Sequence, residues 1–456
     1  MTLFDRPIAP ETYAVIRYGM GFPARDVPLT PQAMIDRLLG PDQMAGDFPF
    51  VSFKRTLELG RTLRLAQKAR KMDGGGQKKA RNAINNLHAK TVTSDFARCV
   101  ETNDPFRERL ARFWMNHFTT RNKTVHLRTG HDGYQAEAIR PHLAGPFSEL
   151  LKAAVTHPFM LLYLDQTVSV GPNSVAGLNT GGGLNENLAR EVLELHTLGV
   201  GAGYTQTDVT EFAELLTGLM FTREKGLDFR PKRAEPGAET VLGKVYGGAG
   251  KAQLSDIYEA LDDLARHPST ASFICTKLAR YFTADQPDPG LVASMIATFV
   301  ETDGYLAQVY AAMLDHPAAW SGFGAKVKWP VDYVASALRA LGVRAADLQE
   351  IPRGQVQKHY LGPLRRMGQN FRSAPGPDGW PDMVADWVDP QGMAARIGFA
   401  MAAARRAPGK PPDPRDFVHS ALGDAAGERL LFAAKAAESR AEGVGIILAS
   451  AEFNRR

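Results

Sequence analysis

Residues 181–200 of the chain read GGGLNENLAREVLELHTLGV. Between 185 and 198 apolar side chains recur every three or four positions, a spacing that predicts an amphipathic helix. Glycine-rich loops lie before and after this segment, and glycine lets a backbone come close to a neighbour or a ligand. We expect the segment to form the central helix of the protein and to carry its candidate functional residues.

The helical wheel of residues 185–198 has an apolar and a polar arc. The apolar arc holds Leu188, Ala189, Val192, Leu193 and Leu195, with His196 in its middle; the polar arc holds Glu186, Asn187, Arg190, Glu191, Glu194 and Thr197. Asn185 suits the N-cap. Arg190 lies four residues from both Glu186 and Glu194, the spacing at which ion pairs form along a helix. One interpretation is therefore a solvated acidic face above a core that contains one histidine.

The other interpretation is that the polar arc lines a cleft. Burial beside a like charge raises the pKa of a carboxyl group, so the glutamates would serve as acid/base groups or as metal ligands. The candidate catalytic residues are Glu191, Glu194, His196 and His117. The candidate binding residues are Asn116, Asn185, Asn187, Arg190, Tyr204 and Asp208. Thr205 to Asp208 also has the form of a capping box, which is a structural explanation for its polar residues.

Histidines gather upstream of the central helix, at His117, His126, His131 and His142. Imidazoles with carboxylates suit zinc, iron or manganese. No HExxH or other fixed ligand spacing occurs, however, so the cofactor is unknown and a divalent metal is the candidate. Asn116 and His117 can equally belong to a buried polar network that joins two helices.

Helical periodicity covers most of the chain, and strand-like alternation is scarce. We expect a mostly α fold, a large multi-helix bundle with long irregular loops and little or no sheet. The bundle is built around predicted helices at 106–118, 185–198 and 206–219. The long irregular segments are expected at 168–184, 221–251 and 342–389, and loops of that length are usually functional or disordered.

We divide the chain into three parts. Residues 1–100 hold N-terminal helices with a basic helical pair, residues 101–345 form the central helical core with the motif, and residues 346–456 form a loop-rich C-terminal helical layer. The sequences His157-Pro158, His267-Pro268 and His316-Pro317 each end one predicted helix and open the next, because proline suits the first turn of a helix. We expect these three histidines to be structural.

Composition excludes several classes of protein. The chain has 456 residues, 44% hydrophobic and 23% charged, as in an ordinary soluble globular protein. Two distant cysteines, Cys99 and Cys275, exclude a disulfide framework and a cysteine zinc site; we expect two buried thiols, with a single bridge as the alternative. No apolar run reaches the length of a membrane span, and the N-terminus has no signal-peptide pattern, so we expect a cytoplasmic protein.

The positive charge is local. Residues 54–90 hold eleven lysines and arginines against Glu58 and Asp73, a net charge of +9, whereas the whole chain carries +5. Such a segment could bind nucleic acid through phosphate groups. It lacks aromatic residues for base stacking after Phe53, however, and charge runs are more often solvated or docked on an acidic partner. We therefore do not expect nucleic-acid binding.

Several segments carry a family resemblance. They are FWMNHF at 113–118, HPFMLLYLD at 157–165, LNENLAREVLELHTLGVGAGYTQTDV at 184–209, LTGL at 216–219, HPSTASFICTKLARYF at 267–282, and the run from Lys328-Trp329-Pro330 to Leu338-Arg339-Ala340-Leu341-Gly342. In these segments the chain resembles the bacterial family called domain of unknown function 1800, from roughly residue 5 to residue 450.

The resemblance implies a mostly helical protein for which no activity is established. Many family members are exported, whereas this chain lacks their export signal. Many are encoded beside a sulfatase-like family, which makes a sulfatase-like protein the candidate partner. Family members usually have a His-Asp pair and a lysine after the loop that follows the second central helix. This chain reads AEPGAETVLG there, at 234–243, and Glu235 is the candidate replacement.

Three functions are consistent with these patterns. The first is a non-catalytic scaffold or partner protein whose central motif forms a buried polar network. The alternative is a metal-assisted or acid/base hydrolase that uses the central glutamates and histidines. The second alternative is a nucleic-acid-binding protein that uses residues 54–90.

Overall fold

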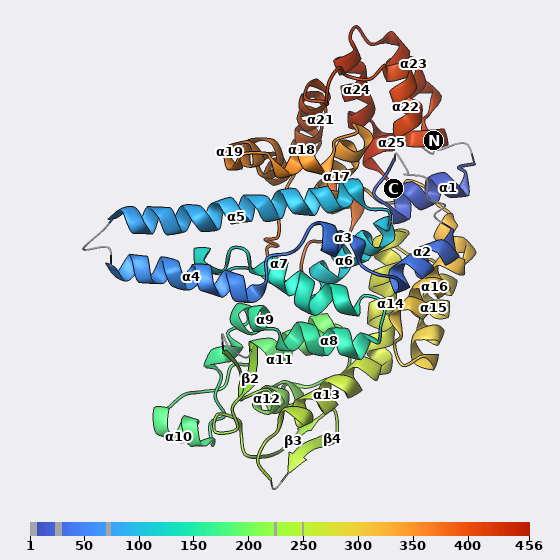
Figure 1. The fold of residues 1–456 in the computed structure, drawn as a ribbon. Helices are drawn as coiled ribbons and strands as arrows, with labels where there is room; N and C mark the ends of the chain where they lie inside the picture. The colour runs from blue at the N-terminus through green and yellow to red at the C-terminus, as the bar shows by residue number, and fades with distance from the viewer. Residues whose placement is uncertain (1–6, 23–29, 70–73, 223–225, 249) are drawn as a thin grey trace.

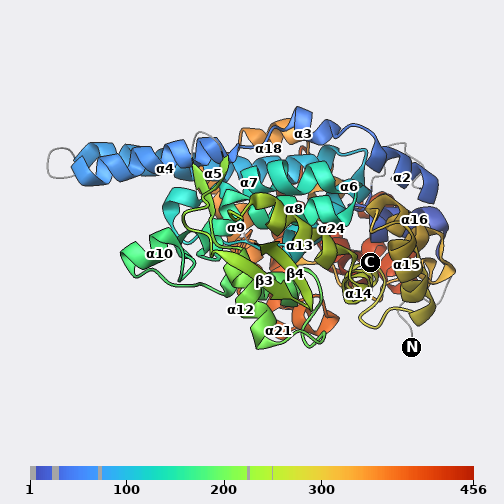
Figure 2. The same cartoon turned by 90° about the horizontal axis from the view of Figure 1, so that it is seen from below.

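The computed structural model describes residues 7–22, 30–69, 74–222, 226–248 and 250–456. In these ranges nearly all regular structure is helical, and the sheet consists of two small antiparallel hairpins. The predicted fold class, mostly α with little sheet, is confirmed. One pair of helices, α4 and α5, extends away from the body of the protein (Figure 1, Figure 2).

The N-terminal part consists of short helices followed by that extended pair. The short elements are α1 (Pro10–Tyr13), η1 (Ala14–Tyr18), α2 (Pro31–Leu39) and α3 (Gln43–Asp47). The pair, which we call the arm, is α4 (Phe53–Lys68) and α5 (Gly74–Glu101). Leu63 of α4 packs with Ala80 and Ile84 of α5, so the arm has a hydrophobic seam of its own. The predicted basic helices are present; Arg70, Lys71 and Asp73 lie outside the described residues.

The central part of the chain surrounds the motif. Its elements are α6 (Pro105–His117), η3 (Val125–Leu127), α7 (Gly130–Tyr134), η4 (Gln135–Ile139), η5 (Arg140–His142), α8 (Phe147–Thr156), α9 (Pro158–Tyr163), η6 (Gln166–Val168), α10 (Val175–Thr180), α11 (Asn187–Glu191), η7 (Val192–His196) and α12 (Gln206–Leu215). Segment 168–184, predicted to be irregular, contains α10. Six residues are too few for helical periodicity to show in a sequence.

Two hairpins lie in the segment predicted to be irregular at 221–251. Strand β1 (Leu219–Thr222) pairs with β2 (Gly226–Phe229), with Leu219 opposite Phe229. Strand β3 (Gly237–Val241) pairs with β4 (Lys244–Gly248), with Glu239 opposite Tyr246. The prediction of a loop is therefore wrong here, and the predicted helix 206–219 ends at residue 215. Strands this short, with glycines in three of the four, show no clear alternation.

The remaining elements cover the other sides of the core. They are α13 (Leu254–Arg266), α14 (Pro268–Phe282), α15 (Pro289–Glu301), α16 (Leu306–Asp315), η8 (Pro317–Trp320), α17 (Pro330–Ala340), α18 (Ala345–Gln349), α19 (Arg353–Val356), η9 (Gln357–Leu361), α20 (Gly362–Arg366), η10 (Val384–Trp387), α21 (Pro390–Arg405), α22 (Pro414–Leu422), η11 (Gly423–Ala425), α23 (Glu428–Ala436), α24 (Arg440–Ala449) and α25 (Ala451–Asn454). Segment 342–389 is thus not one irregular loop, because short helices interrupt it.

One large hydrophobic core contains buried residues from Ala14 to Phe453. Helix α6 crosses it, and its Trp114 is fully buried and donates a 2.7 Å hydrogen bond to the hydroxyl of Tyr310. Cys99 and Cys275 are both buried and free, as expected. Among the helices that the structure describes, none has the length and apolar character needed to cross a membrane. The division of the chain into three parts stays a prediction.

The three His-Pro corners share one hydrogen-bond pattern. Nδ1 of His157, His267 and His316 accepts a bond from the backbone N–H two residues later, at 3.1, 3.1 and 3.2 Å. Each histidine is therefore the N-cap of the helix that comes after it, and its proline occupies the first helical position. Their structural role is confirmed, because each side chain caps the helix that follows it.

Candidate functional site

The motif helix changes its geometry halfway. Residues 187–191 form the α-helix α11, and residues 192–196 form a π-helical turn, η7. The hydroxyl of Thr197 donates to the carbonyl oxygen of Val192 at 2.7 Å, and the N–H of Leu198 donates to that of Leu193 at 3.0 Å, so both bonds span five residues. The extra residue in this turn rotates the later side chains relative to an ideal helix. Thr197, predicted in the polar arc, is consequently fully buried.

Two buried histidines connect the motif to α6. His196 is 1% exposed and His117 is 2% exposed, and their ring centroids lie 6.0 Å apart. Nε2 of His117 lies 3.1 Å from the carbonyl oxygen of His196. Nδ1 of each ring has no hydrogen-bond partner among the described residues. Burial, followed by the nearby charge of Lys277, lowers the pKa of His196 to about 3 and that of His117 well below its usual value.

Lys277 of α14 is the cation beside these histidines. Its ammonium group lies 5.1 Å from the centre of the Phe273 ring. Burial lowers its pKa to about 8, although the carboxylates of Asp382 and Asp378 act in the opposite direction. A lysine with such a pKa loses its proton more easily than one at the surface.

Glu191 lies on the half-buried side of the motif helix. Burial raises its pKa to about 7, the negative charges of Glu194 and Asp378 act in the same direction, and Arg190 opposes them. Tyr163 of α9 is close enough to Glu191 and Asp378 for both to raise its pKa, after burial. The charge of Asp378 therefore raises the pKa of both Glu191 and Lys277. Of the predicted catalytic residues, Glu191 has the pKa best suited to proton transfer.

Asn116 fixes the loop that carries Asp378. Its side chain accepts a 2.7 Å bond from the N–H of Trp380 and donates a 3.0 Å bond to the carbonyl oxygen of the same residue. The preceding Gly379 has φ +86°, and a Cβ there would lie 2.6 Å from the carbonyl oxygen of Asn116. Only glycine fits this close approach without strain. Asn116 thus positions a loop next to the motif.

The remaining predicted binding residues bond within the motif region. Arg190 pairs with Glu186 at 3.1 Å and with Glu194 at 3.4 Å, which confirms the spacing argument, and it donates to Gln206 at 2.9 Å. Asn185 accepts a 2.9 Å bond from the N–H of Asn187, which is itself exposed. These contacts connect α11 to the start of α12.

Asp208 and Tyr204 lie on the far side of the second glycine loop. Asp208 and Thr205 form the predicted capping box of α12, and Asp208 also accepts a 2.7 Å bond from the N–H of Leu242 in the β3–β4 turn. Burial and then the charge of Glu194 raise the pKa of Tyr204. Asp208 thus positions a hairpin, and Tyr204 belongs to the surroundings of Glu194.

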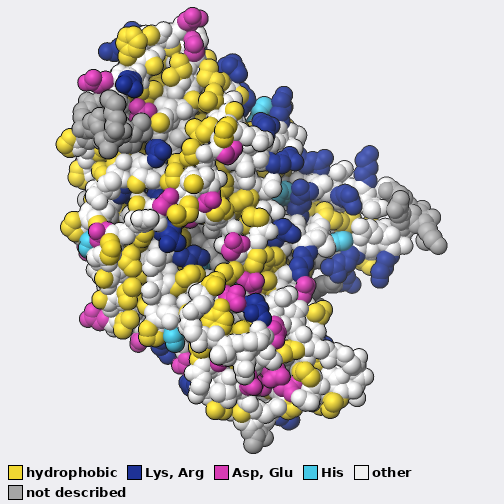
Figure 3. Space-filling view, turned by 180° about the vertical axis from the view of Figure 1, so that it is seen from behind, with side chains coloured by type: hydrophobic (Ala, Val, Ile, Leu, Met, Phe, Trp, Pro, Cys, Tyr) yellow, Lys and Arg dark blue, Asp and Glu magenta, His cyan; other side chains and the backbone are white. Residues whose placement is uncertain are grey.

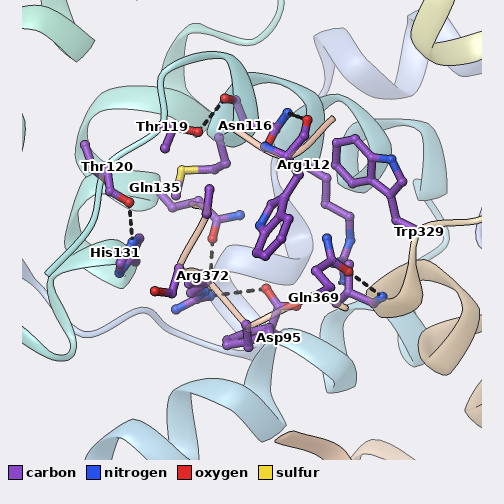
Figure 4. Close-up of a pocket in the computed structure, with 16 residues that line it drawn as sticks. Asp95, Arg112, Asn116, Thr119, Thr120, His131, Gln135, Trp329, Gln369 and Arg372 are labelled. Atoms are coloured by element: carbon purple, nitrogen blue, oxygen red, sulfur yellow. Dashed lines mark hydrogen bonds and ion pairs between the residues drawn. The ribbon is translucent and has the colours of Figure 1, made fainter. Parts of the chain in front are cut away.

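A cavity of about 100 Å³ lies beside Asn116, which is one of its lining residues (Figure 4). Its wall is mixed, with aromatic rings from Trp329, Trp380 and Phe371 and polar groups from Asp95, Arg112, Thr120, His131, Gln135 and Arg372. These residues come from α5, α6 and the segment that follows it, α7, η4 and the chain around residues 329 and 370–380. Asn116 is the predicted site residue that reaches this cavity.

An ion network forms one side of the cavity. Asp95 pairs with Arg112 at 3.0 Å and with Arg372 at 3.2 Å, and Arg372 also pairs with Asp132 at 2.5 Å. Burial would raise the pKa of Asp95, but Arg112 and Arg372 outweigh it and hold that pKa at about 2. Arg372 has φ +51°, a conformation that a non-glycine residue keeps when its surroundings hold it. No local motif connects these residues, so the sequence patterns did not reveal them.

The geometry does not define a metal centre. Within the described ranges, no group of three or more His, Cys, Asp or Glu side chains is arranged to hold a metal ion. The central histidines and glutamates therefore form two neighbouring groups, a neutral histidine pair and a carboxylate pair, instead of one ligand set.

Comparison with known protein families gives the same family that the motif resembles. A family model described as "Protein of unknown function (DUF1800)" matches residues 14–455. The chain belongs to the DUF1800 family. Searches of the curated proteins and of the solved structures found no match for this DUF1800 protein.

Glu235, the candidate replacement for a family histidine or aspartate, has a structural environment in this DUF1800 protein. It is buried, and its carboxylate accepts bonds from the backbone and the side chain of Asn173, at 3.0 and 2.6 Å. Its own N–H donates to the hydroxyl of Thr217 at 2.7 Å. Glu235 therefore holds the loop before α10 against the end of α12.

Proposed function

We propose that this DUF1800 protein is a non-catalytic scaffold that binds an acidic partner protein through the arm. The observation that carries the proposal is the charge of the arm. Its described lysines and arginines between residues 54 and 90 are all exposed: Lys54, Arg55, Arg61, Arg64, Lys68, Lys78, Lys79, Arg81 and Lys90. The arm contributes one described carboxylate in α4, Glu58, which pairs with Arg55 at 3.0 Å. Figure 3 shows these cations along the arm and more of them beside its base.

The arm is suited to docking because it stands away from the body (Figure 1). Its seam of Leu63, Ala80 and Ile84 holds the two helices together. Cations that are left without carboxylates raise the local potential and attract an acidic surface. The resemblance of the chain to its family makes a sulfatase-like protein encoded nearby the candidate partner.

The polar bonds of the motif support a structural role for it within this scaffold. Arg190, Glu186 and Gln206 bond to one another across α11 and α12. Asn116 and Asp208 each bond a backbone segment distant in sequence. These bonds are exposed or partly buried, so each contributes little stability, and together they join α11, α12 and two loops.

The test is a binding measurement with the sulfatase-like protein encoded beside the gene. The variant Arg61→Glu/Arg64→Glu/Lys68→Glu reverses the exposed face of α4, and Arg429→Glu/Lys435→Glu/Arg440→Glu makes the same charge change on α23–α24. We expect the arm variant to lose binding in size-exclusion chromatography and calorimetry, and the control to keep it. Equal binding by both variants would refute docking through the arm. If the wild type bound duplex or single-stranded DNA instead and the arm variant did not, the result would favour a nucleic-acid-binding protein.

A second function, an acid/base hydrolase, is favoured by the pKa of Glu191, which burial and neighbouring carboxylates raise to about 7. A group with that pKa both gives and takes a proton near neutral pH. The test is a panel of chromogenic phosphate, sulfate and carboxylic esters with the wild type and Glu191→Gln. A rate that Glu191→Gln loses and Glu186→Gln keeps, at equal thermal stability, supports an enzyme. The absence of any rate above the blank in the wild type supports the scaffold.

A further inference from the structure

A groove of about 410 Å³ adjoins the cavity at the base of the arm. His88 of α5, Arg128, Arg365 of α20 and Arg372 line it, and no aspartate or glutamate is among its lining residues in the described part of the chain. Residues His131, Phe371, Arg372 and Ser373 line both the groove and the cavity. The groove and the cavity therefore lie next to each other, and these four residues line both.

Two cations of the groove, Arg128 and Arg365, have no carboxylate partner among the described residues. Arg128 donates to the amide oxygen of Asn85 at 2.7 Å, and it has no ion pair among the described residues; neither does Arg365, which is exposed. Arg372 is paired with Asp95 and Asp132, and neither of these carboxylates lines the groove. Burial and then the charges of Arg128 and Arg372 lower the pKa of His88 to about 3. The groove thus presents a positive potential to an incoming anion.

Two polar groups of residues that line the cavity lack a hydrogen-bond partner among the described residues. The hydroxyl of Thr120, 4% exposed, and the indole N–H of Trp329, 3% exposed, have no hydrogen-bond partner among the described residues. Both residues line the cavity. Buried polar groups in native proteins nearly always have partners. Thr120 and Trp329 lie at opposite sides of the cavity (Figure 4), so each would donate to a different oxygen atom of a ligand.

We propose that the groove and the cavity together bind a small phosphorylated organic molecule. Its phosphate lies against Arg128 and Arg365, because guanidinium groups match the oxygens of a phosphate and two of them match its double charge. Its uncharged, oxygen-bearing part reaches into the cavity of about 100 Å³, which Thr120, Trp329 and Trp380 line. The groove shares His88 of α5 with the arm, but none of the lysines and arginines proposed for docking lines it.

Calorimetry on the full chain tests the site with ribose 5-phosphate, inorganic phosphate, ribose and a 20-nucleotide single strand. We expect ribose 5-phosphate to bind at least tenfold more tightly than inorganic phosphate, and ribose alone not to bind. Phosphate and ribose 5-phosphate binding equally well would overturn the role of the cavity. No binding of either, or tighter binding of the oligonucleotide, would overturn the proposal.

Two variants locate the ligand. Arg365→Gln removes an exposed cation that has no ion pair among the described residues, so the fold is kept; we expect ribose 5-phosphate to bind roughly ten- to a hundredfold more weakly. Thr120→Val keeps the shape and removes the unpartnered hydroxyl, so we expect weaker binding of ribose 5-phosphate, unchanged binding of phosphate and no loss of thermal stability. Arg429→Gln on α23 is the charge-matched control and binds like the wild type. Unchanged affinity in Arg365→Gln refutes the site.

Discussion

Nε2 of His117 lies 3.1 Å from the carbonyl oxygen of His196, so the last residue of α6 bonds to the end of the motif helix. A carbonyl oxygen only accepts, so the proton of His117 is on Nε2. Its Nδ1 and that of His196 have no partners among the described residues, and both rings are held neutral by burial. This pair fastens the motif helix to the core, and its neutrality makes the fold sensitive to acid.

His196 makes stability depend on pH in one direction. Its pKa is about 3 in the folded protein, below the value of about 6.5 in an unfolded chain. Its contribution is therefore complete above about pH 6.5 and is lost as the pH falls towards 3. We expect His196→Asn to be less stable than the wild type at pH 7, and the difference to shrink by up to about 1.4 kcal/mol per pH unit below pH 6.

Urea unfolding at pH 7, 6, 5 and 4 measures that difference. A difference in unfolding free energy that stays constant over this range would mean that His196 takes up its proton equally in both states.

Glu191 has the opposite dependence. Its pKa is raised to about 7, above the unfolded value of about 4.3, so its contribution is complete below about pH 4 and is lost as the pH rises through 7. We expect the stability of Glu191→Gln, measured against that of the wild type, to be greater at pH 8 than at pH 4. The gain is at most about 1 kcal/mol, because water screens a half-exposed carboxylate.

Thermal unfolding at pH 4 and pH 8 provides the measurement. Glu186→Gln on the same helix is the control, because it loses contacts to Arg190, Gln206 and Thr210 and gains nothing at high pH. If the stability of Glu191→Gln relative to the wild type were lower at pH 8 than at pH 4, the pKa of Glu191 would not be raised by folding.

Gly379 is required by the Asn116 clamp. A Cβ at this position would lie 2.6 Å from the carbonyl oxygen of Asn116, at a backbone φ of +86°. We expect Gly379→Ala to destabilise the protein by about 1–3 kcal/mol and to release Trp380, seen as a red shift of tryptophan fluorescence. Gly398→Ala, in the exposed middle of α21 with no atom within 4 Å of its Cβ, should be neutral or stabilising by up to about 1 kcal/mol. Similar effects of both changes would disprove the clamp.

Asp332 of α17 is the shared partner of buried arginines. It pairs with Arg109, with Arg112 at 3.4 Å and with Arg456 at 3.5 Å. Removal of one charge from a buried cluster leaves the others uncompensated, so we expect Asp332→Asn to reduce the free energy of unfolding by about 3–5 kcal/mol. Asp347→Asn, which breaks the exposed pair with Arg344, should have no measurable effect. Calorimetric unfolding measures the free energy of unfolding of both variants. An equal loss in Asp332→Asn and Asp347→Asn would show that the buried charge cluster does not stabilise the fold.

The sequence predicted the local features of the motif well. The burial of His196, the two ion pairs of Arg190 and the capping box of Thr205 and Asp208 all result from spacings of three or four residues. The predicted face of Thr197 is wrong because a helical wheel assumes 100° per residue, and the π-helical turn departs from it. The hairpins at 219–248 escaped prediction because their strands have only four or five residues.

By itself, the sequence determined which of the long segments are helical, where many of them begin, and that positive charge is concentrated in residues 54–90. These properties depend on residues within one or two turns of each other. Only the tertiary structure decided that Asp95, Arg112 and Arg372 form one ion network, that Asp378 lies near Glu191 and Lys277, and which polar groups are buried. The physical reason is desolvation: the pKa and the partners of a charged side chain are set by what packs around it, and those neighbours come from residues hundreds of positions away.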